Sequence, residues 1–204
     1  MFNRMEIKQR AKATFLNEYG ISIGAYVLYV LIAAAASTIT WGLGALLIAP
    51  PLMVGYCSFV LHIYKGESGD IGDMFANGFS NYGRNLGGML WMELFVFLWS
   101  LLFVIPGIIK ALAYSMTPFI LADCPNVRAT DAIKLSMRMT HGHKGGIFVM
   151  CLSFIGWWIL SGLTFGILQI LFVGPYTSTS FAGLYVDLKA RALNNGIIRP
   201  EELA

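Results

Sequence analysis

One acidic side chain, Glu93, stands well inside a long apolar segment, GGMLWMELFVFLWS. A carboxylate at the depth of membrane hydrocarbon is costly, so such a group faces other helices, takes up a proton or meets a partner. Two interpretations follow from this placement. Glu93 is either a site for a proton or a cation, or a polar anchor that is hydrogen-bonded to a neighbouring helix.

A single lysine, Lys110, lies near the start of another apolar run, three residues after Pro106-Gly107. Its aliphatic stem can follow the helix while the ammonium group reaches the membrane interface, which explains the residue at low cost. The alternative places Lys110 in a cleft between helices. There Tyr114, one turn further along, helps it to hold a lipid phosphate.

Four consecutive hydroxyl residues follow the Gly174-Pro175 pair: Thr177, Ser178, Thr179 and Ser180. This segment is too polar for a helix that faces lipid. The hydroxyl groups either line an internal polar path or hydrogen-bond to backbone carbonyl groups near the proline.

The loop at 123–145 is rich in cations, and two interpretations of it are open. The cations either bind anionic lipid headgroups, at about 1 kcal/mol for each well-placed cation, or only set the orientation of the chain. The candidates are Arg128, Lys134, Arg138 and Lys144. The nearby His141 and His143 have no carboxylate or cysteine beside them in the sequence, so no metal site is expected.

Sequence motifs of the zinc proteases and nucleotide-binding enzymes are missing. The chain has no His-Glu-x-x-His, no glycine-rich phosphate loop and no pair of intramembrane aspartates. We therefore expect a protein that is not an enzyme, with no catalytic residues and no cofactor. A net charge of +3 on such an apolar chain is explained by membrane orientation, so no nucleic-acid partner is expected.

The composition excludes an ordinary soluble domain. Hydrophobic residues make up 57% of the chain and charged residues 12%, against about a quarter charged in soluble proteins. Apolar segments of the length of membrane spans or somewhat shorter lie at 20–41, 51–64, 86–105, 107–122, 146–172 and 174–188. The second, fourth and sixth segments begin at or beside a proline, which suits the first turn of a helix.

These segments predict an all-α, polytopic membrane protein with about six transmembrane helices arranged as three helical hairpins. We expect one integral membrane domain over residues 1–204. Its parts are an amphipathic segment at 1–19 and hairpins at 20–64, 84–123 and 146–190. All 14 Lys and Arg residues except Lys110 lie on one side of this arrangement, so both termini are expected in the cytoplasm.

The segments between the hairpins are amphipathic and suggest a threefold repeat of one unit. In the segment GDIGDMFANGFSNYGRN, Asp70 is expected to cap the start of the helix. The unit consists of an amphipathic helix, a long span, a turn and a short span. Such helices lie in the headgroup plane with their apolar side down, or they pack against the cytoplasmic ends of the spans. Gly-x-x-x-Gly pairs at the start of each long span, such as Gly83/Gly87, are expected to let helices approach closely.

Two long motifs resemble the membrane family called domain of unknown function 975, found mainly in Gram-positive bacteria. They are LWSLLFVIPGIIKALAYSMTPFILADCP and GHKGGIFVMCLSFIGWWILSGLTFGI, the second followed by GPY. The resemblance implies a multi-pass protein of the bacterial cytoplasmic membrane with no established activity. It therefore supplies no functional residues.

The function expected from these observations is that of a non-enzymatic envelope protein that interacts with lipids or with another protein. Its expected partners are membrane lipids, anionic ones among them, and a membrane-protein partner or a second copy of the chain. The alternative is a small transporter or lipid-translocating protein with a polar cleft near Glu93 and Lys110.

Overall fold

Each predicted amphipathic segment folds as a helix that leads into a long apolar helix. The computed structural model describes residues 2–39 and 43–203, and every regular element within them is helical. The amphipathic helices are α1 (Arg4–Asn17), α4 (Ile71–Ser80) and α8 (Ala129–Thr140). Asp70 caps α4, as predicted: its side chain accepts a hydrogen bond from the backbone N–H of Gly72 at 2.7 Å.

The apolar helices follow the predicted order, although their bounds differ. They are α2 (Tyr19–Ile39), α3 (Leu43–Lys65), α5 (Tyr82–Leu102), α6 (Val104–Tyr114), α7 (Thr117–Asp123), α9 (Lys144–Leu152), α10 (Ile155–Leu163), the π-helix η1 (Gln169–Val173) and α11 (Gly174–Asn194). A short 3₁₀ helix, η2 (Pro200–Leu203), follows. The sixth segment begins at Gly174-Pro175, as expected.

The predicted start of the second segment at residue 51 is wrong. Helix α3 begins at Leu43 and continues through Pro50 and Pro51. A proline inside a helix removes the hydrogen bond to the carbonyl group four residues earlier, and the carbonyl oxygen of Leu47 loses its partner to Pro51 in this way. The Tyr82 hydroxyl replaces that partner, because it donates to the Leu47 oxygen at 3.2 Å.

Two predicted spans are interrupted. The fourth is divided into α6 and α7 by a break at Ser115 and Met116, and the fifth into α9, α10 and η1. Four stretches of the described residues have the length and apolar composition to cross a membrane: Tyr19–Thr38, Gly44–Lys65, Val104–Asp123 and Lys144–Leu163. The all-helical class is confirmed, and the six crossings stay a prediction.

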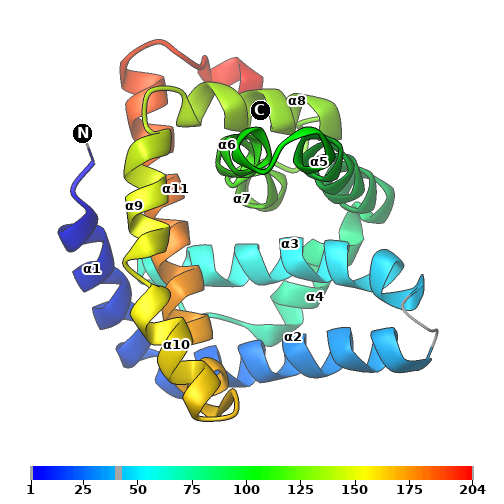
Figure 1. The fold of residues 1–204 in the computed structure, drawn as a ribbon, viewed down its shortest axis with the longest axis vertical. Coiled ribbons are helices and arrows are strands. Elements are labelled where there is room, and N and C mark those ends of the chain that lie inside the picture. The colour runs from blue at the N-terminus through cyan, green and yellow to red at the C-terminus, as the bar shows by residue number, and fades with distance from the viewer. Residues whose placement is uncertain (1, 40–42, 204) are drawn as a thin grey trace.

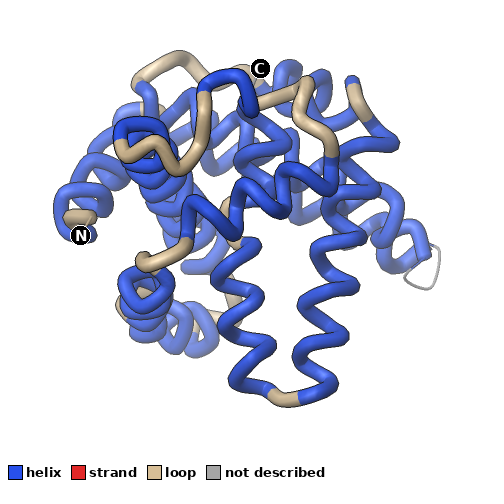
Figure 2. Tube along the Cα trace, turned by 90° about the horizontal axis from the view of Figure 1, so that it is seen from above, coloured by secondary structure: helices blue, strands red, loops and turns tan. Residues whose placement is uncertain are grey.

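Two pairs of successive apolar helices pack together, α2 with α3 and α5 with α6, and the pairs point in different directions. In Figure 1, α2 and α3 lie across the view, α11 runs down it, and α5 and α6 are seen end-on. Figure 2, turned by 90°, shows the α5–α6 pair lengthwise, with its connecting loop directed away from the rest of the chain. The apolar helices therefore do not form a parallel bundle.

One helix from each of the three predicted hairpins lies at the centre of the molecule. We call α3, α7 and α11 the central helices; α3 packs against both of the others, and Phe119 of α7 stacks on Tyr185 of α11 at 5.8 Å. Each amphipathic helix packs against a central helix of the preceding unit: α4 on α3, α8 on α7, and α1 on α11. Helix α1 thereby closes the series into a ring.

The apolar sides of the amphipathic helices are used for this packing. Ile7, Ala11 and Phe15 of α1 are all buried within the chain, and so is Met74 of α4. Of the two interpretations of these helices, the structure favours packing against the ends of the apolar helices.

The expected role of the Gly-x-x-x-Gly pairs is wrong for Gly83/Gly87, because a Cβ atom added at either residue meets no atom within 4 Å. At the start of the third long span, a Cβ atom at Gly146 would lie 2.9 Å from the ring of Phe2. The close approach occurs at Gly55 of α3, where a Cβ atom would lie 2.0 Å from the backbone oxygen of Met74 in α4. Glycine is required at position 55 because α3 and α4 touch there backbone to backbone.

We predict that Gly55→Ala destabilises the protein by about 1–3 kcal/mol, the usual cost of overpacking, because no flexible side chain can move aside. Gly87→Ala is the matched control, and alanine is the better helix former there, so its effect should be neutral or slightly stabilising. Thermal unfolding in a mild detergent measures both. Equal destabilisation by the two substitutions would contradict this account of the packing.

Candidate functional site

A cavity of about 220 Å³ lies between the three central helices. It is lined by Met53, Tyr56, Cys57, Val60, Ser115, Pro118, Phe119, Thr177, Ser178 and Phe181. These residues come from α3, from the α6–α7 break and the start of α7, and from the first half of α11. Each unit of the predicted repeat therefore contributes one wall of the cavity.

The wall of this cavity is mainly apolar, despite its hydroxyl residues. The Ser115 hydroxyl donates to the Leu112 carbonyl oxygen at 2.8 Å, and the Thr177 hydroxyl to that of Val173 at 2.5 Å. Both hydroxyl hydrogens are therefore bonded to backbone carbonyl oxygens near them in the chain. The hydroxyl of the buried Tyr56 makes no hydrogen bond within the described part of the chain.

A second hollow, of about 430 Å³, lies beside the first and is more open. We call it the lateral groove; it is lined by Met53, Met89, Met92, Glu93, Val96, Phe97, Ser100, Ala111, Tyr114, Ser115 and Pro118. Glu93 is the one ionisable acid of this lining. Met53, Ser115 and Pro118 line both hollows, so the groove and the central cavity are neighbours that share a wall at the break between α6 and α7.

The break between α6 and α7 is held by hydrogen bonds from α8. The Ser136 hydroxyl donates to the Ala113 oxygen at 2.8 Å and accepts from the Met116 backbone N–H at 3.2 Å. Thr140 also donates to the Ala113 oxygen, at 3.2 Å. These side chains replace the helical hydrogen bonds that are missing at the break. The backbone groups at the break therefore keep hydrogen-bond partners inside the protein.

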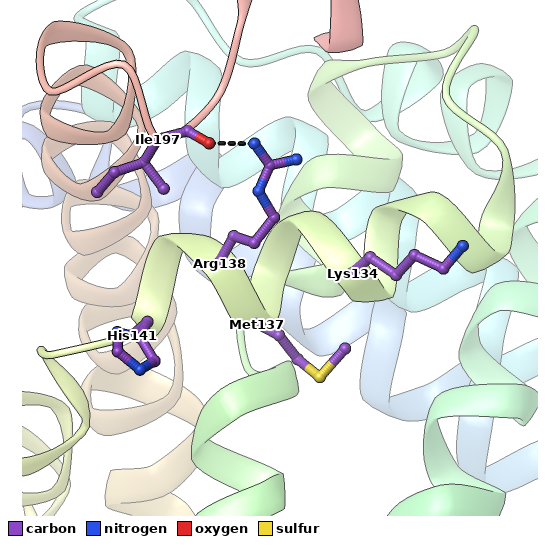
Figure 3. A pocket seen from close by; sticks show the side chains of 5 residues that line it. All are labelled: Lys134, Met137, Arg138, His141 and Ile197. Atoms are coloured by element: carbon purple, nitrogen blue, oxygen red, sulfur yellow. Dashed lines mark hydrogen bonds between the residues drawn. The ribbon is translucent and has the colours of Figure 1, made fainter.

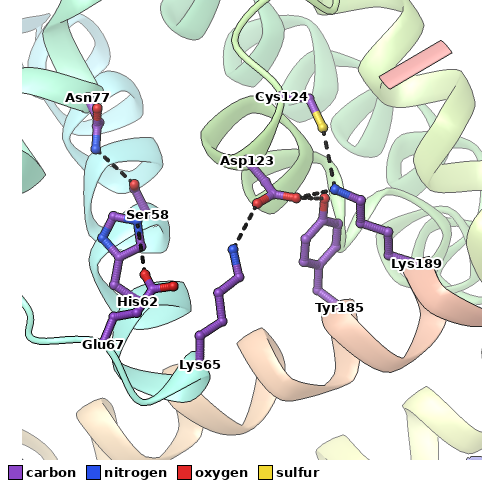
Figure 4. A network of polar contacts seen from close by, with 9 residues as sticks. All are labelled: Ser58, His62, Lys65, Glu67, Asn77, Asp123, Cys124, Tyr185 and Lys189. Carbon is purple, nitrogen blue, oxygen red and sulfur yellow. Dashed lines mark hydrogen bonds and ion pairs between the residues drawn. The ribbon is translucent and has the colours of Figure 1, made fainter. Parts of the chain in front are cut away.

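The ends of the three central helices are joined at one carboxylate, Asp123 (Figure 4). Lys65, at the end of α3, approaches one of its oxygens at 3.3 Å, and Lys189 of α11 binds the other. Tyr185 donates to the same carboxylate at 2.9 Å. Phe119 lines the central cavity and stacks on Tyr185, so one residue of the cavity wall contacts this ionic cluster.

The structure places Lys110 beside the lateral groove, not in its lining. Its ammonium nitrogen lies 4.9 Å from the ring centre of Trp99 and 5.9 Å from that of Tyr114. Cation–π contacts of this kind stabilise an ammonium group that has no anionic partner. Tyr114 is buried and forms part of the groove wall, as the cleft interpretation required.

The hydroxyl run at the start of α11 mainly serves the helix itself. Thr177, Thr179 and Ser180 each donate to the carbonyl oxygen four residues earlier, at 2.5–2.9 Å. Ser178 lies beside the Tyr56 hydroxyl at the central cavity. The structure therefore favours the carbonyl-bonding interpretation for three of the four residues.

Three of the four predicted basic candidates are paired within the chain. Arg128 and Lys134 both bind Asp131, at 2.8 and 3.3 Å, and Arg138 binds Glu202 at 2.6 Å. Arg138 also donates to the carbonyl oxygen of Ile197 (Figure 3).

These contacts change the acidity of the two carboxyl groups. The hydrogen bond from Arg138, with one from the backbone N–H of Arg199, lowers the pKa of Glu202 to about 2. The hydrogen bond from Arg128 likewise lowers the pKa of Asp131. Both acids are therefore ionised at neutral pH and cancel much of the positive charge on this surface. Lys144 begins α9 and is absent from these pairs.

The histidines and cysteines do not form a metal centre in the described residues, among which no three potential ligands of the His, Cys, Asp or Glu type lie together. The described cysteines, Cys57, Cys124 and Cys151, are free thiols, and the first two are buried.

The ionic cluster and its support were missed by sequence reasoning, although one signal existed. Lys65, Asp123 and Lys189 each directly follow a predicted short apolar segment, that is, 51–64, 107–122 and 174–188. Arg84 was also missed. Its guanidinium donates to the carbonyl oxygens of Leu121 and Cys124, at 3.0 and 2.6 Å, and so caps the end of α7.

We predict that Asp123→Asn lowers the free energy of unfolding by about 2 kcal/mol, between the values typical of exposed and of buried ion pairs. Its side chain is 15% exposed, and the substitution leaves two lysines without a counter-charge. Asp131→Asn is the matched control, because Asp131 also binds two cations but is 31% exposed, and its partners are 84% and 67% exposed. Its expected cost is below about 1 kcal/mol. Chemical unfolding in detergent compares them, and equal losses would contradict a structural role for the cluster.

Comparisons with known proteins give one match. No curated protein and no solved structure matches the chain. A family model, described as "Protein of unknown function (DUF975)", matches residues 101–192, which include the α6–α7 break, Asp123 and most of α11. The resemblance to domain of unknown function 975 is thereby confirmed over residues 101–192.

Proposed function

We propose that this chain is a non-enzymatic membrane protein that binds a lipid-like molecule, which enters the lateral groove from the bilayer. The observation that carries this proposal is the open, mainly apolar groove, which adjoins the central cavity and shares the wall of Met53, Ser115 and Pro118 with it. Ligand sites of small hydrophobic molecules are hollows of this size and lining.

The groove supports lipid binding better than the basic surface does. An anionic headgroup on α8 must compete with Asp131 and Glu202 for Arg128, Lys134 and Arg138. The hollow beside Lys134, Arg138 and His141, about 480 Å³, is therefore a weaker candidate, although its lining can still accept a headgroup.

The membrane itself is proposed to be the bacterial cytoplasmic membrane, crossed several times, with both termini in the cytoplasm. The distribution of Lys and Arg supports this orientation. In this orientation the ionic cluster lies on the cytoplasmic side, and the uncharged stretch 94–109 around the turn into α6 lies on the other side. A membrane-protein partner or a second copy of the chain stays a further prediction.

A second candidate function, the passage of a small solute, is favoured by the break between α6 and α7. Interrupted helices at membrane depth are a recurrent feature of transport sites, where non-helical backbone lines a cavity. Here Ser115 and Pro118, on either side of the break, line both hollows. Glu93 then takes the role of a proton or cation site.

The lipid-binding proposal predicts that Ala111→Phe, which fills the groove, reduces lipid retention about tenfold. The measurement is native mass spectrometry of protein reconstituted in vesicles of phosphatidylethanolamine and phosphatidylglycerol, then extracted in mild detergent. Ile109→Phe is the control, because Ile109 lies on the same helix and is exposed outside the groove. Equal retention by the wild type and both variants would overturn the proposal.

The transport alternative predicts a proton flux in vesicles that contain pyranine. After a pH step, vesicles with wild-type protein should equilibrate faster than empty vesicles, and Glu93→Gln should abolish the difference. Rates equal to those of empty vesicles for the wild type, or an unchanged rate for the variant, would count against this alternative.

A further inference from the structure

Glu93 is the only charged side chain in the lining of the lateral groove, and its charge is not matched by the protein. In the described part of the chain no lysine, arginine or histidine lies within ion-pair distance of its carboxylate. It also takes part in no hydrogen bond there. A carboxylate on the middle of α5, about 16 Å along that helix, is therefore left for something outside the chain to neutralise.

The rest of the groove lining is suited to a bulky organic molecule. Three methionines, Met53, Met89 and Met92, line it, and their flexible, polarisable side chains adapt to ligands of different shape. Phe97 and Tyr114 add aromatic rings. This combination of one acid, aromatic rings and thioethers is complementary to a hydrophobic cation.

A cation already rests against the aromatic rings at the margin of this groove. The ammonium nitrogen of Lys110 lies over Trp99 and near Tyr114, the latter being part of the groove wall. The rings at this place thus stabilise positive charge. Lys110 does not neutralise Glu93, since the two side chains form no ion pair.

We propose that the lateral groove selects lipophilic cations, molecules with a delocalised or quaternary positive charge and a large apolar surface, and that Glu93 is the residue that selects the charge. This inference rests on the proposed function, because it names the class of ligand that the same groove takes. A cationic ligand gains the attraction of the carboxylate in a medium of low dielectric constant, whereas an anion of the same shape is repelled.

The test uses two probes of the same shape and opposite charge, tetraphenylphosphonium and tetraphenylborate. Binding is measured by equilibrium dialysis against the full chain in phosphatidylcholine nanodiscs, with empty nanodiscs subtracted. The wild type should bind the phosphonium at least tenfold more tightly than the borate. Glu93→Gln should weaken phosphonium binding at least tenfold and leave borate binding unchanged or tighter.

Three further variants locate the effect. Lys110→Gln should tighten phosphonium binding severalfold, because it removes a positive charge beside the groove. Ala111→Phe should weaken binding of both probes, because it fills the groove. Glu201→Gln, which removes an exposed acid of the C-terminal 3₁₀ helix, should change neither.

The outcomes separate this inference from the proposed function. If both probes bind equally, Glu93→Gln has no effect and Ala111→Phe blocks both, the groove binds hydrophobic molecules without regard to charge. That result keeps the proposed function and overturns the inference. If neither probe binds above empty nanodiscs, or if Ala111→Phe leaves phosphonium binding intact, the inference is overturned, and the lipid-retention experiment decides the proposed function on its own.

Discussion

The joining of three helix ends at the Asp123 carboxylate is the constraint on which the rest of the arrangement depends. Lys65 and Lys189 come from the first and third units, and both reach the single acid at the end of α7. Along their lengths α3 packs on α7 and on α11, and the cluster adds a polar link where α3 and α7 end. The stacked rings of Phe119 and Tyr185 connect this link to the lining of the central cavity.

The interruption of the middle helix lies beside the candidate site. Helix α6 packs on α5, whereas α7 packs on α3 and carries Asp123 at its end. Between them, at Ser115 and Met116, the helical hydrogen bonding is interrupted, and Ser136 and Thr140 of α8 bind backbone groups there. Ser115 also lines both hollows, so the candidate site lies at the one interrupted point of this helix.

Much of the helical order was predictable, because apolar length, proline and charge act locally. The amphipathic helices, the Asp70 cap and the start of α11 followed from such signals. Pro51 misled the prediction, because the Tyr82 hydroxyl that compensates for it lies far away in the sequence. The sequence could not predict the pairing of Arg138 with Glu202 or the hydrogen bonds and ion pairs around Asp123, because these contacts depend on which helix ends lie together. Glu93 was singled out from the sequence, but the groove beside it depends on the direction of α5 relative to α3.

The exposed turns also have a mechanical consequence. The described turns are apolar to an unusual degree: Phe103 and Ile105 are more than 70% exposed, and Phe165 is 98% exposed. In the proposed orientation these turns would lie among the acyl chains of the leaflet opposite the ionic cluster. The bilayer around them would have to adapt to the area that they occupy, and the elastic energy of that adaptation would depend on the curvature already present.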